Sequence, residues 1–123
     1  MAKNEVFEDG DDLALTCSHP TTPASGDPVR YGELVGVAKT AEGTDGKTSV
    51  TLKGVHLLSV KGIDGSGNSA VAVGDKLYYT DGDTPPISKK ATGRFVGFAV
   101  EAGSNAGTVG SSLTATIPVR LSN

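Results

Sequence analysis

The sequence predicts an all-β fold: a small barrel or sandwich built from two related β units, with little or no helix and an extended N-terminal arm. The first observation is an internal repeat, because GDPVRY at residues 26–31 returns as GDKLYY at 74–79. Each copy is followed by a second echo, LVGVA at 34–38 and FVGFA at 95–99. Short apolar runs also recur between turn residues at the spacing typical of β-sandwiches and barrels.

Composition limits the kind of protein. The chain has 123 residues, enough for one domain with a real core, but it lacks Trp and is only 5% aromatic. Seventeen Gly and six Pro indicate frequent turns. A net charge of −3 with scattered basic residues argues against nucleic-acid binding. No apolar run approaches the roughly 18 residues of a membrane span, so we expect neither a nucleic-acid nor a membrane partner.

The elements follow in order along the chain. Residues 1–12 are polar and acidic and are expected to form an arm that orders only on contact with a partner. Residues 13–123 are expected to form a single β domain, with pseudo-repeats at about 26–60 and 74–121. Its first strand is Leu13–Cys17, where apolar residues alternate with polar or small ones. A proline-punctuated loop then leads to the first Gly-Asp pair.

The remaining strands complete the two repeats. Val29–Tyr31 and Leu34–Lys39 come first, and a long strand over Val50–Leu57 is expected to carry a bulge at Gly54. Residues 51–57 and 116–121 are taken as matching third strands of the two repeats. In the second repeat, residues 76–80 and 95–101 are predicted strands. The last strand, 113–121, alternates strictly, and Pro118 predicts that it lies at a sheet edge or beside a bulge.

Glycine and aspartate mark the expected turns and bends. The pairs Gly26-Asp27 and Gly74-Asp75 each precede a strand, and each suits a tight turn in which the Asp side chain accepts backbone N–H bonds. Gly36 and Gly97 lie inside apolar strands, where glycine marks a bend or a close backbone approach. Sharply curved barrel strands or a subunit contact would explain both.

No pattern for catalysis, cofactor binding or metal binding stands out. The segment Ala41–Thr48 (AEGTDGKT) fits a relaxed phosphate loop, but the strand-like sequence after it lacks the helix that this mechanism needs, so a polar hairpin turn is expected. Cys17 and His19 form a two-ligand pair without a predicted third ligand, and Cys17 is interpreted as a buried apolar residue. The sequence therefore predicts no enzyme, no cofactor and no metal site.

Several segments, taken in order, resemble the small capsid cement or head decoration proteins of tailed phages. They are MAKN at the N-terminus, SGDPV, GVA, VTL.GVH.L, VGDKLYY, FVGFAVEA and the closing T..IPVRL. Some members of that group carry a recombinase label, which these residues do not support. The resemblance implies a structural protein on the outer surface of the virion capsid, assembled in the host cytoplasm, with the major capsid protein as partner. It also implies a homotrimer that cements the expanded shell.

The arm is the expected contact with the capsid. We expect it to add a strand to a capsid-protein edge, with Val6 and Phe7 as apolar anchors. The candidate capsid-binding residues are Lys3, Glu5, Val6, Phe7, Glu8 and Leu13. The body is expected to close a ring through a heterologous interface, which leaves no free edges to aggregate.

Two other classes of protein remain open from the sequence. The first is a small binding module on the virion for a host surface or a carbohydrate, which would need exposed aromatic rings. The second is an enzyme accessory such as a nucleotide-dependent recombination factor. Deleting the arm separates the first class from a cement protein, and a test of ATP binding checks the second.

Overall fold

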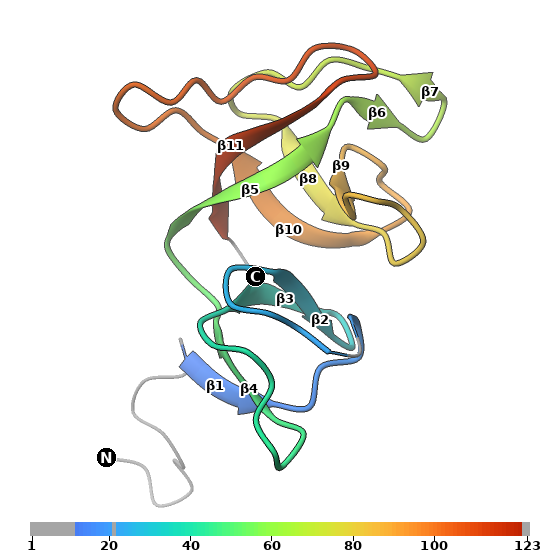
Figure 1. Ribbon diagram of the computed structural model, residues 1–123. Coiled ribbons are helices and arrows are strands. Elements are labelled where there is room, and N and C mark those ends of the chain that lie inside the picture. The colour runs from blue at the N-terminus through green and yellow to red at the C-terminus, as the bar shows by residue number, and fades with distance from the viewer. Residues whose placement is uncertain (1–11, 21, 122–123) are drawn as a thin grey trace, which may run out of the picture.

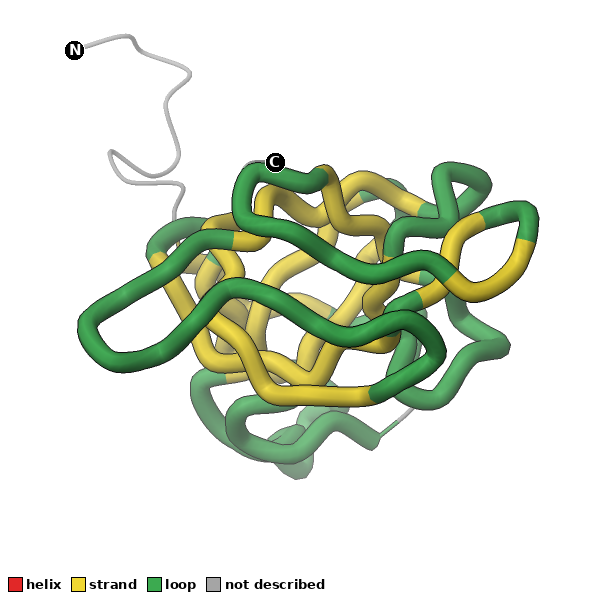
Figure 2. The backbone as a smooth tube through the Cα atoms, turned by 90° about the horizontal axis from the view of Figure 1, so that it is seen from above, coloured by secondary structure: helices red, strands yellow, loops and turns green. Residues whose placement is uncertain are grey.

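The computed structural model describes residues 12–20 and 22–121, and within them it contains strands and no helix (Figure 1). The all-β prediction is confirmed. The strands are β1 (Asp12–Leu15), β2 (Pro28–Tyr31), β3 (Leu34–Ala38), β4 (Thr48–Thr51), β5 (Val55–Lys61), β6 (Ile63–Asp64), β7 (Gly67–Asn68), β8 (Lys76–Tyr79), β9 (Ile87–Ser88), β10 (Arg94–Ala99) and β11 (Thr114–Leu121). Seen from above, most strand segments lie around a central interior, and several loops extend outward beyond them (Figure 2).

The strands form two units. The first unit, residues 12–51, is an antiparallel sheet in the order β1-β4-β3-β2. After β1 the chain runs to β2, the strand at the opposite edge of this sheet. There the amide N–H groups of Ser18 and His19 donate to the Arg30 carbonyl at 2.7 and 3.2 Å. The sheet is therefore nearly closed. The second unit, residues 55–121, is a closed barrel in the order β10-β11-β5-β9-β8, with the β6–β7 hairpin projecting from it (Figure 1).

The four strands of the first unit match four of the five barrel strands in order and pairing, and β9 has no counterpart. In the first, Ala38 of β3 pairs with Val50 of β4, which pairs with β1 on its other side. In the second, Ala99 of β10 pairs with Val119 of β11, which pairs with β5 on its other side. Thus β1, β2, β3 and β4 occupy the positions of β5, β8, β10 and β11. The prediction that residues 51–57 form the third strand of the first unit is wrong. That strand is β4, because the chain leaves the first sheet after Thr51 and continues as β5 of the barrel.

The two Gly-Asp turns have the same hydrogen bonds. Gly26 N–H donates to the Ala38 carbonyl, and Gly74 N–H donates to the Ala99 carbonyl, both at 2.7 Å. Asp27 Oδ2 accepts from the backbone N–H of residue 24 at 2.9 Å, and Asp75 Oδ2 accepts from that of residue 72 at 2.8 Å. Both glycines have positive φ, +88° and +93°, which favours glycine at these positions.

The core shows how the two units join. Barrel side chains, among them Leu77, Tyr79 and Ile117, are almost fully buried and form one cluster. Val35 and Val37 of β3 belong to the same cluster, so one face of the first sheet packs against the barrel core and closes it where the two units meet. The other face of the sheet packs in a smaller cluster of Val29, Ala38 and Val50 with Leu15, Cys17 and Leu52.

Two further details of the sequence prediction differ from the structure. The expected bulge at Gly54 is wrong: φ there is +96°, between the end of β4 and the start of β5, so this residue turns the chain from one sheet to the next. Pro118 does not lie at a sheet edge, because β11 pairs with β5 along its length and with β10 over residues 119–121. Pro118 instead lies where the pairing with β10 stops, so its missing N–H breaks no pair of that ladder.

Gly36 and Gly97 both lie where backbones approach closely. A Cβ on Gly36 would be 2.5 Å from the Thr51 carbonyl oxygen and 2.6 Å from a Val50 methyl group. A Cβ on Gly97 would collide with the Arg120 carbonyl oxygen, and the register of β10 against β8 shifts between Phe95 and Gly97. Neither position leaves room for a side chain.

Candidate functional site

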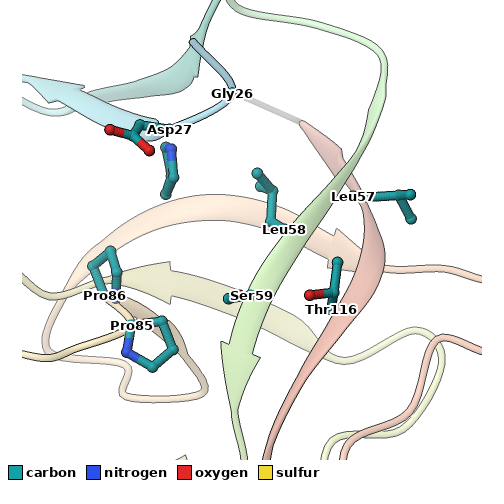
Figure 3. Close-up of a pocket in the computed structure, with 9 residues that line it drawn as sticks. Gly26, Asp27, Leu57, Leu58, Ser59, Pro85, Pro86 and Thr116 are labelled. Atoms are coloured by element: carbon teal, nitrogen blue, oxygen red, sulfur yellow. The ribbon is translucent and has the colours of Figure 1, made fainter. Parts of the chain in front are cut away.

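The junction between the two units is hollowed by two adjoining pockets. The first, of about 270 Å³, lies between the turn at residues 26–28, strands β5 and β11, and the prolines Pro85 and Pro86 (Figure 3). The second, of about 250 Å³, shares Asp27, Pro28 and Pro86 with it and extends toward His19 and Tyr79. Together they form an open groove along the seam between the units.

Polar contacts bridge this seam. The His19 ring Nδ1 lies 2.6 Å from the Tyr79 hydroxyl, and the two rings meet edge to face. The guanidinium of Arg30 donates two bonds to the Asp81 carboxylate, from Nε at 2.8 Å and from Nη2 at 2.7 Å. Glu33 accepts a bond from Arg94 Nε at 3.0 Å. Each contact joins the first unit to the second, so these side chains hold the units in one arrangement.

The electrostatics of the seam fit a structural role. Burial raises the pKa of Tyr79, which therefore stays a neutral hydroxyl at physiological pH. The hydrogen bonds from Arg30 lower the pKa of Asp81, and the same bonds raise the pKa of Arg30, so the pair stays charged. The side chain of Arg30 is only 14% exposed, which shields the contact in part from solvent.

The positions considered for chemistry are placed as follows. Cys17 is half-buried, and burial raises the pKa of its thiol, which disfavours the reactive thiolate. Among the described residues, no three His, Cys, Asp or Glu side chains gather in a way that could hold a metal ion. The phosphate-loop-like segment at 41–48 runs directly into β4 and not into a helix.

Of the candidate capsid-binding residues, only Leu13 lies in the described part of the chain. Lys3, Glu5, Val6, Phe7 and Glu8 lie outside it. Leu13 is half-buried in β1 and pairs with Val50 of β4. Within the described residues β1 pairs only with β4, so it is an edge strand of the first sheet and directly continues the expected arm.

A further surface was missed by the sequence reasoning. The rings of Tyr78, Phe95 and Phe98 meet edge to face on the outer side of β8 and β10, with centroids 5.9 and 5.6 Å apart. All three are half-buried. Val55 and Leu57 of β5 are 49% and 56% exposed. In the sequence, these five residues alternate with residues that are buried or half-buried in the structure. The sequence does not show that they share the outer surface of the barrel, because that depends on the pairing of β10 with β8 and of β11 with β5.

The fold and these surfaces define a small β scaffold that presents apolar and aromatic surface outside its core. Among the described residues no helix is long and apolar enough to cross a membrane. A family model for phage cement proteins matches residues 7–121. The chain therefore belongs to the phage cement protein family, which confirms the resemblance and gives it a structural role in the phage capsid. Comparisons with curated proteins and with solved structures gave no match.

Proposed function

We propose that this protein binds the outer surface of a tailed-phage capsid and cements the expanded shell, with the major capsid protein as its partner. The match to the cement family over residues 7–121 carries the proposal. The near-duplicated β body and its internally paired seam support it, because a rigid scaffold transmits load between the surfaces it contacts. Many copies on one shell would add small individual contributions into a large one.

The arm is the proposed capsid-binding element. It precedes β1, an edge strand, so an added strand from the capsid protein would continue the first sheet through backbone hydrogen bonds. Lys3, Glu5, Val6, Phe7, Glu8 and Leu13 are the residues proposed for this contact. Leu13 would act through β1 itself, as the place where the arm is anchored to the body.

The proposed assembly state is a homotrimer at the shell surface. A heterologous contact that closes into a ring leaves no unpaired surface to recruit further copies. The exposed side chains of Val55 and Leu57 support an association surface on the barrel. Assembly would take place in the host cytoplasm, where shells form.

A carbohydrate- or host-binding module is the alternative function. Such a module needs aromatic ring faces open to a sugar. Tyr31 is 47% exposed, at the tip of the β2–β3 hairpin, and is the candidate for such a contact. Tyr78, Phe95 and Phe98 pack against one another edge to face, which fits a protein contact better than a sugar platform.

A shell-stability assay tests the proposal. Cognate expanded shells stripped of the protein are heated with and without it, and capsid disruption is followed by light scattering. We expect the full chain to raise the disruption temperature, a chain lacking residues 1–11 to lose the effect, and Tyr31→Ser to keep it. An unchanged disruption temperature with the full chain bound would contradict a cement role. Loss of the effect in Tyr31→Ser, with the fold intact, would mean that Tyr31 contacts the shell, which contradicts its assignment to a sugar contact.

A further inference from the structure

One row of side chains crosses the outer face of the barrel. Phe98 of β10 lies directly opposite Lys76 of β8 on one side and Arg120 of β11 on the other. Directly paired residues of neighbouring strands point to the same face. The residues next to them in sequence, such as Leu77, Ala99 and Val119, are buried. The row therefore faces outward and consists of an aromatic ring between two cations.

The two cations of this row have no partner within the described residues. Three other cations of the second unit do form ion pairs: Lys89 with Asp75, Lys90 with Asp83, and Arg94 with Glu33 of the first unit. Lys76 and Arg120 are exposed and make no ion pair or side-chain hydrogen bond inside the described part of the chain. Strands β5, β8, β9, β10 and β11 also contain no Asp or Glu. This wall is thus basic and aromatic in a protein that is acidic as a whole.

The negative charge of the chain is concentrated in its arm. Residues 1–12 contain one Lys and five acidic residues, a formal charge of −4, whereas residues 13–123 contain ten basic and nine acidic residues, a formal charge of +1. The arm sequence Glu5-Val6-Phe7-Glu8-Asp9 places an acid, an aromatic ring and an acid at alternate positions 5, 7 and 9. Alternate residues share one face of an extended strand. That face would read acid, ring, acid.

We propose that this arm face binds the Lys76–Phe98–Arg120 row of a second copy of the chain. Glu5 and Asp9 would pair with the two cations, and Phe7 would pack on the aromatic cluster of Phe98, Phe95 and Tyr78. Across two strand spacings the row is about 10 Å long, and four residues of extended arm cover about 14 Å, a difference that the long Lys and Arg side chains can span. The pattern of charge and apolar surface matches on both sides.

The inference deepens the proposed function, on which it rests, by naming the contact between copies. The arm of one copy would bind the Lys76–Phe98–Arg120 row of the next copy. Because the two partner surfaces differ, this is a heterologous contact, as a closed ring requires. Of the residues proposed for the capsid contact, Glu5 and Phe7 would then face the neighbouring copy, whereas the opposite face of the arm, with Val6 and Glu8, and the arm backbone remain free for the capsid protein. A single extended arm would then contact both a neighbouring copy and the shell.

A charge-exchange experiment on full-length chains tests the contact. One variant reverses the two cations of the row, K76E/R120E, and a second reverses the arm, E5K/D9K. The control K47E/K61E reverses two lysines that lie outside the row, one in the first unit and one at the far end of β5. Mass is measured by light scattering at low salt over a range of concentrations. We expect the native chain and the control to associate. Each reversed variant alone should associate at least about tenfold more weakly. A mixture of the two should recover association, because the arm of each variant is complementary to the barrel row of the other, although a ring of three can hold only two such contacts.

The outcomes are distinct. Association of both reversed variants at the native strength, or a mixture that stays at 12.4 kDa, would overturn the inference, as would a native chain that is monomeric throughout. Restoration only in one chain carrying all four changes would mean that the arm binds its own barrel. Circular dichroism checks that each variant is folded. Shell binding is measured in parallel: failure of self-association with shell binding intact rejects this contact and leaves the cement function standing.

Discussion

The two Gly-Asp turns give a quantitative test of the repeated architecture. In each turn one carboxylate oxygen accepts a backbone N–H bond, at 2.9 Å for Asp27 and 2.8 Å for Asp75. A hydrogen bond to a charged group contributes about 1.5–3 kcal/mol when it is shielded from water. Both carboxylates are partly exposed, so solvent screening lowers this to about 1 kcal/mol. We expect Asp27→Ala and Asp75→Ala each to lower the free energy of unfolding by about that amount.

Urea unfolding followed by far-UV circular dichroism measures both changes. Asp75 also lies 3.5 Å from the Lys89 ammonium, so its substitution is expected to cost a few tenths of a kcal/mol more. Asn keeps the accepting oxygen, and Asp27→Asn and Asp75→Asn are the matched controls, with less than half the loss. Because the turns lie in different units, the double Ala variant should lose about 2 kcal/mol. Equal losses for Ala and Asn, or a loss at only one turn, would refute the reasoning.

Three further predictions concern packing and pH. Gly36→Ala should destabilise the fold by about 1–3 kcal/mol, because its Cβ would meet the Thr51 carbonyl oxygen at 2.5 Å, whereas Gly82→Ala, with open space around it, should be near neutral in the same urea assay. Burial raises the pKa of Tyr79 in the folded protein, so above about pH 10 the unfolded chain loses this proton while the folded protein keeps it, and stability falls as the pH rises. Tyr79→Phe should remove this fall in melting temperature at alkaline pH. Arg30 lowers the pKa of Asp81, so the pair stabilises the fold above about pH 4, and this contribution is lost as the pH falls further. Asp81→Asn should lower the free energy of unfolding by about 1 kcal/mol at pH 7 and should weaken the dependence of stability on pH below about pH 4. An unchanged dependence on acidic pH would contradict the assignment.

Much of the fold was predictable because local signals were strong. The Gly-Asp echo predicted two tight turns, and the structure places both with matching hydrogen bonds. Alternating apolar residues predicted the strand at 113–121, since one face had to be buried. The absence of helical spacing predicted an all-β chain. Each of these inferences depends on neighbours within a few residues.

Properties that depend on pairing between distant strands were not predictable. Nothing local distinguishes a bulge at Gly54 from a change of sheet, because glycine with positive φ suits both. The equivalence of β4 with β11 appears only in the registers of Ala38 with Val50 and of Ala99 with Val119. The outward row on the barrel likewise requires three strands to be aligned. Each of its residues alone is an ordinary surface position.

Binding to purified shells tests the central claim most directly. The full chain is sedimented with expanded and with unexpanded cognate shells, and the bound copies per shell are counted. The cement function predicts saturable binding to expanded shells, at a fixed number of copies, and little binding to unexpanded ones. Equal binding to both forms, or no saturable binding to the expanded form, would contradict it.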